Sequence, residues 1–251
     1  MTRKILVLLM AVLLFASGLL VCFYPNYHGS YVDHTLRSDA NDFLRQTEPQ
    51  QHTDGTPQHT HSAAESTPPE TVAYQDLLED MKTYNQTIYI NGQAGLSSKL
   101  SYEEPSFLLA DYGLDSEIFG VISIPKLEIK LPIYLGATYQ HMNDGAAHLS
   151  QTSLPIGGEN TNCVIAGHRG WSGAHFFRYI TDLEYGDTVT ITNLWETLHY
   201  TVVDTQIIEP NEVDQILIQP GHERLTLLTC HPYASGGKQR YLVICERTEH
   251  E

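Results

Sequence analysis

The second half of the sequence is a series of short apolar runs separated by turn residues, and this pattern constrains the fold more than any other feature. Short runs bounded by Gly, Pro, Asn or Asp are typical of β-strands. Two longer gaps leave room for one or two short helices, of which His175–Asp182 is the apolar candidate. Eight such strands predict an all-β barrel or sandwich. The runs occupy residues 119–124, 129–134, 163–166, 188–192, 198–203, 206–209, 225–230 and 240–246.

The N-terminus carries a longer apolar run, over residues 5–24, that contains no charged side chain. About 20 residues at a rise of 1.5 Å each cross a hydrocarbon core of about 30 Å. Arg3 and Lys4 precede the run, which favours a cytoplasmic segment 1–4 and an exported remainder. A cleaved signal peptide is the alternative, because Ala16-Ser17-Gly18 is an acceptable cleavage site. We expect a single-pass membrane anchor over 5–24.

The composition changes after the anchor. Residues 47–71 are rich in Thr, Gln, His, Pro and Ser, and they hold too few apolar side chains to offset chain entropy on folding. We therefore expect residues 25–71 to form a flexible, disordered spacer outside the membrane. Its histidines, His52, His59 and His61, are interpreted as solvated side chains rather than as metal ligands.

An amphipathic helix is predicted between the spacer and the strands. Apolar residues recur there at intervals of three and four, at Leu77, Leu78, Met81, Tyr84 and Ile88. Residues 72–116 are assigned to this helix and to an irregular segment that follows it. The strand-rich domain is assigned to residues 117–248.

The charge balance excludes one class of partner. The formal net charge is −16, with 14 Lys and Arg against 30 Asp and Glu. A nucleic-acid-binding surface needs clustered cations, and no run of Lys or Arg occurs, so we expect no nucleic-acid partner.

The four cysteines must each be judged singly, because none stands in a C-x-x-C pair that would indicate zinc or redox chemistry. Cys163 and Cys245 lie inside apolar strands, where cysteine usually packs as a small hydrophobic residue. Cys22 belongs to the apolar N-terminal run. We expect no metal or cofactor, since the carboxylates of Glu159, Asp182, Glu184 and Asp187 have no recognisable calcium-loop spacing.

Cys230 ends its strand among polar residues and has a chemically useful neighbour. Residues 231–239 include Pro232, Gly236 and Gly237 and can connect two antiparallel strands as a hairpin. Cys230 and Arg240 would then be cross-strand neighbours about 5 Å apart. A guanidinium beside a cysteine favours the thiolate and can donate to an oxyanion.

His168 is the candidate proton carrier. It follows the apolar strand 163–166 inside Gly167-His168-Arg169-Gly170, and loops at strand ends commonly present reactive side chains. The spacing alone does not bring it to Cys230, so an ordinary loop histidine is the alternative. His231 is the less suitable base, because successive strand residues point to opposite faces.

These segments resemble the sortase family. Thr226-Leu-Leu-Thr-Cys230 matches the T-L-x-T-C motif, and an arginine follows ten residues later. Ile165-Ala-Gly-His-Arg-Gly170 resembles the segment that carries the sortase histidine, and the similarity extends over about 115–247. The resemblance implies a sortase-like eight-stranded β-barrel behind the anchor, spacer and amphipathic helix.

The resemblance also implies roles for individual residues. Cys230 would attack a sorting signal of the L-P-x-T-G type on a surface protein or pilin, His168 would be the acid and base, and Arg240 would bind the oxyanion. Thr229 would line the substrate groove. The acceptor would be an amine, either a pilin lysine or a peptidoglycan cross-bridge, at a Gram-positive-type cell surface.

The class is a narrower question. Gly145-Ala-Ala-His-Leu149 and Thr229-Cys-His-Pro-Tyr233 look most like class C, pilin-polymerising sortases, although another class stays open. Those enzymes commonly carry an Asp-Pro-aromatic lid, whereas this chain offers only Glu104-Pro105-Ser106-Phe107, a degenerate lid or none. Two alternatives to a transpeptidase remain: an exported cysteine peptidase that only hydrolyses, and a membrane-tethered barrel that binds peptides without turnover.

Overall fold

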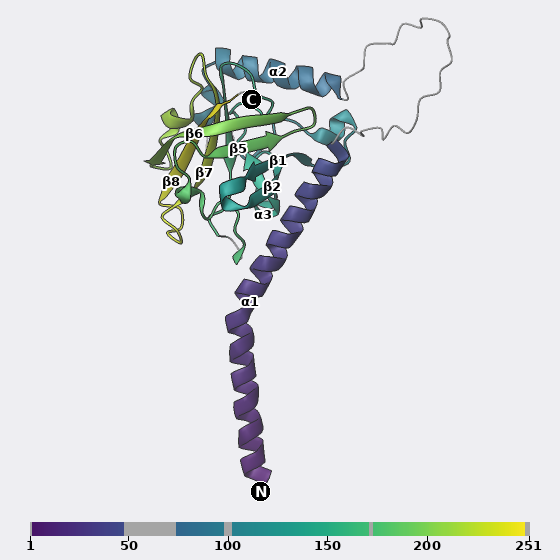
Figure 1. The fold of residues 1–251 in the computed structure, drawn as a ribbon, viewed down its shortest axis with the longest axis vertical. Coiled ribbons are helices and arrows are strands. Elements are labelled where there is room, and N and C mark those ends of the chain that lie inside the picture. The colour runs from purple at the N-terminus through teal and green to yellow at the C-terminus, as the bar shows by residue number, and fades with distance from the viewer. Residues whose placement is uncertain (1, 48–73, 98–101, 171–172, 249–251) are drawn as a thin grey trace, which may run out of the picture.

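The computed structural model describes residues 2–47, 74–97, 102–170 and 173–248. The strands gather into one body, with α2 across one end and α1 running away from it (Figure 1). The α-helices are α1 (Thr2–Thr47), α2 (Gln75–Ile90) and α3 (Tyr139–Asp144). The strands are β1 (Ile118–Ile124), β2 (Ile129–Leu135), β3 (Ala146–His148), β4 (Thr161–Ala166), β5 (Thr188–Thr192), β6 (Thr197–Ile208), β7 (Glu223–His231) and β8 (Gln239–Arg247).

The strands close into a barrel in the order β1-β2-β3-β4-β7-β8-β6-β5, which confirms the predicted all-β, eight-stranded fold. β2–β3 and β4–β7 pair in parallel, and the other neighbours pair antiparallel. Successive residues of a strand point to opposite faces. Cys163 and Ile165 of β4 therefore enter the barrel core, whereas Val164 and Ala166 lie on its outer wall.

Two strand assignments were wrong in detail. Residues 198–203 and 206–209 form one strand, β6, rather than two. The pairing of β6 with β8 shifts register between Val202 and Asp204, and this irregularity interrupts the apolar alternation. β3 was missed because its three residues are too short to show an alternating pattern.

The predicted helix over 175–182 is also wrong. The segment consists of turns, with a single 3-10 turn at Ile180–Asp182. Phe176, Phe177 and Ile180 are all buried in the barrel core. Their apolar character reflects burial in the barrel core rather than the apolar face of a helix.

α1 continues to Thr47, which corrects the prediction that residues 25–71 form a spacer throughout. Leu36, Ala40 and Phe43 recur at helical spacing and are buried against the barrel, so packing stabilises this half of the helix. The helix bends about midway (Figure 1), and a proline at position 25 accounts for such a bend. The rest of the predicted spacer, with its three histidines, lies outside the described residues.

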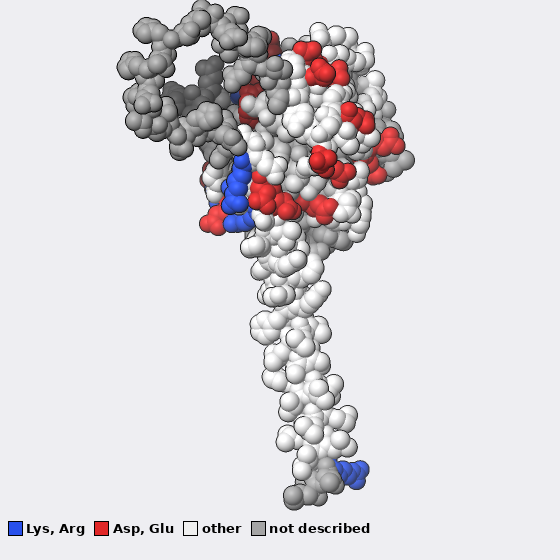
Figure 2. Space-filling model, turned by 90° about the vertical axis from the view of Figure 1, so that its right-hand side faces the viewer, with Lys and Arg blue, Asp and Glu red and all other residues white. Residues whose placement is uncertain are grey.

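The other half of α1 is apolar and unpacked. Within the described part of the chain, α1 alone is long and apolar enough to cross a membrane, and none of its most apolar 18-residue window is buried. Figure 2 shows this stem free of acidic and basic side chains between its basic tip and the folded body. α1 is therefore a candidate transmembrane span.

α2 confirms the predicted amphipathic helix. It buries Leu77, Met81 and Ile88 on one face, together with the polar Asn85. The Asn85 side chain is satisfied, because its Oδ1 accepts the N–H of Leu154 at 2.7 Å. This contact attaches α2 to the loop between β3 and β4.

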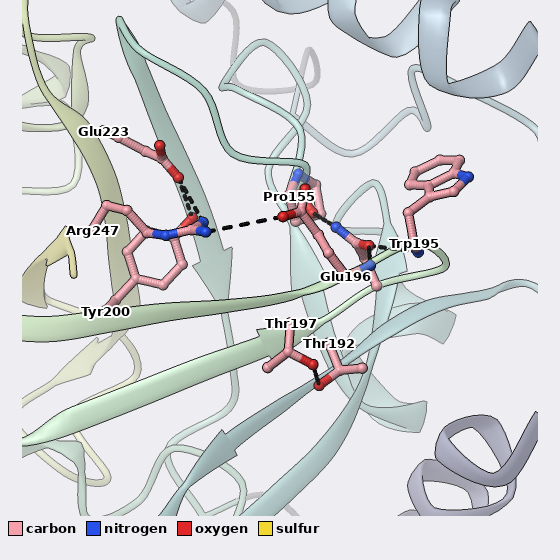
Figure 3. A network of polar contacts seen from close by, with 9 residues as sticks. Pro155, Thr192, Trp195, Glu196, Thr197, Tyr200, Glu223 and Arg247 are labelled. Atoms are coloured by element: carbon pink, nitrogen blue, oxygen red, sulfur yellow. Dashed lines mark hydrogen bonds and ion pairs between the residues drawn. The ribbon is translucent and has the colours of Figure 1, made fainter. Parts of the chain in front are cut away.

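Figure 3 shows a polar network around Glu223, at the start of β7, whereas Cys230 lies near the other end of that strand. Arg247 Nη1 donates to Glu223 at 3.0 Å, and the guanidinium lies 5.8 Å from the centre of the Tyr200 ring. Asn193 donates to the carbonyl of Pro155 at 3.0 Å, and its oxygen accepts two backbone N–H groups of the β5–β6 turn. Because Glu223 begins β7 and Arg247 ends β8, these contacts fix the two strands that carry Cys230 and Arg240 at their far end.

Candidate active site

Cys230 and Arg240 are register partners across the antiparallel β7–β8 pair, as the hairpin predicted. The half-buried Cys230 lies near the end of β7, and Arg240 lies near the start of β8. The Nη1 of Arg240 donates to the carbonyls of Gly237 at 2.7 Å and Gln239 at 3.1 Å. The guanidinium is thus held beside the thiol by the backbone of the β7–β8 loop.

Gly237 explains how closely this loop approaches the pair. Its φ is +78°, a conformation that glycine adopts without strain. A Cβ at this position would lie 3.1 Å from Nη1 of Arg240 and 3.3 Å from Sγ of Cys230. The absent side chain therefore leaves space for both reactive groups.

His168 is brought toward Cys230 by the parallel pairing of β4 with β7. Ala166 pairs with Leu228, and beyond this pair the N–H of Gly167 donates to the carbonyl of Leu228 at 3.1 Å. His168 follows Ala166 by two residues, beyond the end of β4, just as Cys230 follows Leu228 by two residues on β7. Cys230 shares the outer face of β7 with Leu228, since residues two apart in a strand share a face.

The environment of His168 favours its neutral form. Its ring is half-buried, and the Phe176 ring packs against it edge to face at 5.9 Å. Burial lowers the pKa of His168 below its ordinary value, because desolvation disfavours the charged imidazolium. A neutral imidazole at physiological pH can accept a proton from a thiol.

The Thr229 side chain is buried near the end of β7. Its side chain is 1% exposed, and its hydroxyl donates to the carbonyl of Gly167 at 2.7 Å. The contact joins the end of β7 to the residue before His168. The predicted place of Thr229 in a substrate groove stays a prediction.

Two residues that the sequence did not single out as a pair meet on the opposite face. The Nη1 of Arg169 lies 2.8 Å from Nδ1 of His231, and the His231 ring stacks on Tyr241 at 5.7 Å. Tyr241 packs against the barrel core, so His231 shares the inner face and not the face of Cys230. The alternation of strand residues could have indicated this face, but not the partner.

An apolar cluster covers the outer wall beside the candidate site. Leu228 and Leu242 of β7 and β8 belong to it, with Ala166 of β4. Tyr102 packs against this cluster, and its carbonyl accepts the N–H of Ala137 at 3.0 Å. Phe107 of the segment considered as a lid packs instead against the rings of Tyr84 of α2 and Tyr112. Of Tyr102 and Phe107, it is therefore Tyr102 that packs at the outer wall.

Two of the other cysteines and two of the carboxylates considered as metal ligands have structural surroundings. Cys163 and Cys245 are buried in the core, and burial raises the pKa of both thiols above the ordinary value. Lys126 bridges Glu184 at 3.0 Å and Asp187 at 2.7 Å, so these carboxylates are already paired. Over the described ranges, no three His, Cys, Asp or Glu side chains gather as metal ligands would.

A half-buried cysteine beside an arginine, with a histidine just beyond the end of the neighbouring parallel strand of a closed β-barrel, is a set of groups that can carry out acyl transfer through a thioester. The family model for the sortase domain matches residues 122–248, about half of the chain. The protein belongs to the sortase family.

Curated relatives and solved structures agree with this membership. The chain is 30% identical to Sortase D of Bacillus subtilis over 130 residues, which are 51% of this chain and 63% of the relative. It is 31% identical to Sortase A of Streptococcus agalactiae over 117 residues, which are 45% of this chain and 47% of the relative. The matches thus span about half to two thirds of these relatives.

The solved structures point to class C. Sortase C-1 from Streptococcus pneumoniae gives a TM-score of 0.64 at 28% identity, covering 85% of this chain and 100% of that one. Sortase C from Clostridium perfringens gives a TM-score of 0.61 at 28% identity, with coverage of 85% and 99%. Class C sortases are thus among the structures that this chain resembles over most of its length.

Proposed function

We propose that the protein is a membrane-anchored transpeptidase that cleaves a sorting signal of the L-P-x-T-G type and joins the acyl product to an amine. The observation that carries the proposal is the register pair of Cys230 and Arg240 on β7 and β8, and it is supported by the position of His168 just beyond the end of β4, the parallel partner of β7. The family membership supports the same chemistry.

The first half of the reaction forms a thioester. His168 accepts the thiol proton of Cys230 as the sulfur attacks the peptide carbonyl. The oxyanion is stabilised by Arg240, whose guanidinium has five N–H donors and so retains donors beyond those of Nη1. The tetrahedral intermediate collapses, the C–N bond breaks, and His168 returns its proton to the leaving amine.

The second half consumes the thioester. An incoming amine attacks the acyl carbon and loses a proton to His168, a new C–N bond forms, and the C–S bond breaks. The proton returns to the sulfur, and the enzyme is regenerated. Attack by water in place of the amine gives hydrolysis.

We propose a class C type of substrate, in which both the sorting signal and the acceptor lysine belong to pilins. The support is the likeness to solved class C structures, among them a sortase C1 of a streptococcal pilus island with a TM-score of 0.62 at 29% identity. The alternative acceptor is a peptidoglycan cross-bridge. In a class C type of enzyme, the aromatic side chain of a lid would be that of Tyr102, which packs at the outer apolar wall.

The proposed location is the outer side of the cell membrane, with the apolar half of α1 as the anchor. The barrel-proximal half of α1 is part of the folded body, since Leu36 and Ala40 are buried against it. The site would therefore be held at a fixed distance from the bilayer rather than on a loose tether.

The test uses the full-length chain in detergent, a panel of sorting-signal peptides, and lysine-bearing acceptors. The proposal expects a product in which the acyl fragment is bonded to the acceptor amine. Cleavage that gives no amine-linked product with any acceptor would identify a peptidase. Retention of intact peptide without cleavage would identify a binding barrel. Either result would overturn the proposal.

A further inference from the structure

The loop after β4 contacts the end of β7 through Arg169 and His231. The Nη1 of Arg169 lies 2.8 Å from Nδ1 of His231 and donates to the carbonyl of Cys230 at 3.4 Å. Its Nη2 donates to Oγ1 of Thr181 at 3.2 Å. Arg169 thus joins the loop after β4, the end of β7 and the segment that leads to β5.

The chemistry of the two groups fixes the proton on His231. A guanidinium has donors only, so Nδ1 of His231 must be the acceptor, and the neutral ring carries its proton on Nε2. Protonation at Nδ1 would remove the acceptor and set two cations against each other. The contact therefore exists only while His231 is neutral.

In the described part of the chain, no carboxylate pairs with the His231 ring. Its ring stacks on Tyr241, its carbonyl accepts the hydroxyl of Ser235, and its register partner Gln239 donates to Glu209. Among the described contacts, Arg169 is the charged side chain at the ring. Burial, followed by the charge of Arg169, lowers the pKa of His231 below its ordinary value.

The location of the contact gives it a consequence for the site. His168 lies beyond the last ladder pair of β4, between Gly167 and Gly170, so the ladder alone does not fix it. Arg169 is the next residue, just as His231 is the next residue after Cys230. The contact of Arg169 with His231 therefore restrains the backbone of the adjacent residues, His168 and Cys230.

We propose that Arg169 is a positioning residue, which, by donating to neutral His231, holds His168 level with Cys230 for the acyl transfer. The inference rests on the proposed function. The proposal implies that protonation of His231 breaks its contact with Arg169. Turnover should then fall as the pH is lowered, even while the protonation states of Cys230, His168 and Arg240 stay the same.

The test compares full-length variants by their kcat against pH with a sorting-signal peptide. Arg169→Gln is expected to lower kcat about ten- to hundredfold with little change in KM, since a misplacement of about 1 Å costs on that order. The control is Arg178→Gln, in the same loop, whose guanidinium packs on Tyr233 at 4.9 Å and not on His231. Equal kcat in the two variants would overturn the proposal.

His231→Gln separates positioning from general folding. A glutamine Oε1 can accept from Arg169 but does not titrate. This variant is expected to keep kcat at neutral pH and to move the acid limb of its profile to lower pH. An acid limb that stays where the wild type has it would refute the pH-sensitive contact.

A second readout does not depend on transpeptidation. If the wild-type chain makes no product, the proposed function fails, while the alignment is still measured by the pH dependence of Cys230 alkylation, mapped by mass spectrometry. Arg169→Gln is expected to raise the midpoint of that profile, because it withdraws the histidine from the thiol, whereas Arg178→Gln leaves it in place. Identical midpoints in all three chains would contradict the inference.

Discussion

Cys230 and Arg240 face each other as a register pair on β7 and β8, and the guanidinium is held there by one carbonyl of the intervening loop and one at the start of β8. The pairing places the thiol that would attack a carbonyl beside the guanidinium that would stabilise the resulting oxyanion. Each of the following expectations depends on this geometry or on the elements that support it.

Replacing Arg240 with lysine should abolish most of the turnover while leaving the fold intact. Lysine keeps the charge but loses the planar array of donors that can bond the loop carbonyls and an oxyanion together. Loss of one oxyanion donor typically lowers kcat by about 10²- to 10³-fold. The measurement is kcat alongside the thermal midpoint, with the exposed Lys238→Gln as the control; an Arg240→Lys enzyme as fast as that control would rule out the role.

Gly237→Ala should impair the site beyond the strain that it adds to the backbone. Its Cβ would press on Sγ of Cys230 and Nη1 of Arg240. Gly236→Ala is the matched control, because Gly236 has a similar φ of +72° but no atom within 4 Å of its Cβ position. Both variants should lose about 1 kcal/mol of stability, and only Gly237→Ala should also lower kcat. Equal turnover in the two would show that the close approach is unimportant.

The helix α1 should be sensitive to a methyl group at Gly29. A Cβ there would come within 2.4 Å of the Gly173 backbone, and nearby Asp33 accepts the N–H of His175 at 2.9 Å. Gly29→Ala should therefore lower the thermal midpoint by at least about 2–4 °C, corresponding to about 1 kcal/mol. Gly18→Ala, with no atom within 4 Å, should not lower it. A midpoint unchanged by Gly29→Ala would mean that α1 does not pack on the loop after His168.

Stability should fall with acid because of His148. Its ring is fully buried, Nε2 lies 3.0 Å from the carbonyl of Ser153, and burial lowers the pKa of His148 to about 4. The unfolded chain has the ordinary pKa of about 6.5, so it binds the proton first, and folding loses up to about 3 kcal/mol as pH falls from about 6.5 to 4.

Urea unfolding measured across this pH range tests the expectation for His148. His148→Gln should flatten the dependence between these values and is compared with His222→Gln, an exposed histidine paired with Glu246. A wild-type free energy of unfolding that stays constant from pH 6.5 to 4 would contradict the assignment.

The parts of the site that depend on local chain geometry were predictable from the sequence. The hairpin that aligns Cys230 with Arg240 follows from two strands and a short loop. The alignment of His168 depends on the parallel pairing of β4 with β7, which are far apart in the chain, so only the family motif indicated it. Arg169 and His231 were not paired in advance, because a contact between side chains requires that same register.

The fold shows the same division. Leu36, Ala40 and Phe43 have a helical spacing in the sequence, yet the polar residues between them suggested a spacer. Their burial depends on the barrel surface that covers them, which the sequence does not show. The two phenylalanines at 176 and 177 suggested a helix because burial alone cannot distinguish a helix from a core-facing turn. In both cases tertiary packing decided the local structure.

The central claim is that Cys230 forms a thioester with a sorting-signal peptide, and mass spectrometry of the full-length chain after exposure to that peptide without an acceptor tests it most directly. The account predicts an added acyl mass that maps to Cys230, is absent from Cys230→Ala, and is discharged by a lysine amine. Cys163 and Cys245, whose buried thiols resist ionisation, should stay unmodified. An adduct that persists in Cys230→Ala, or amine-linked product formed by that variant, would contradict the account.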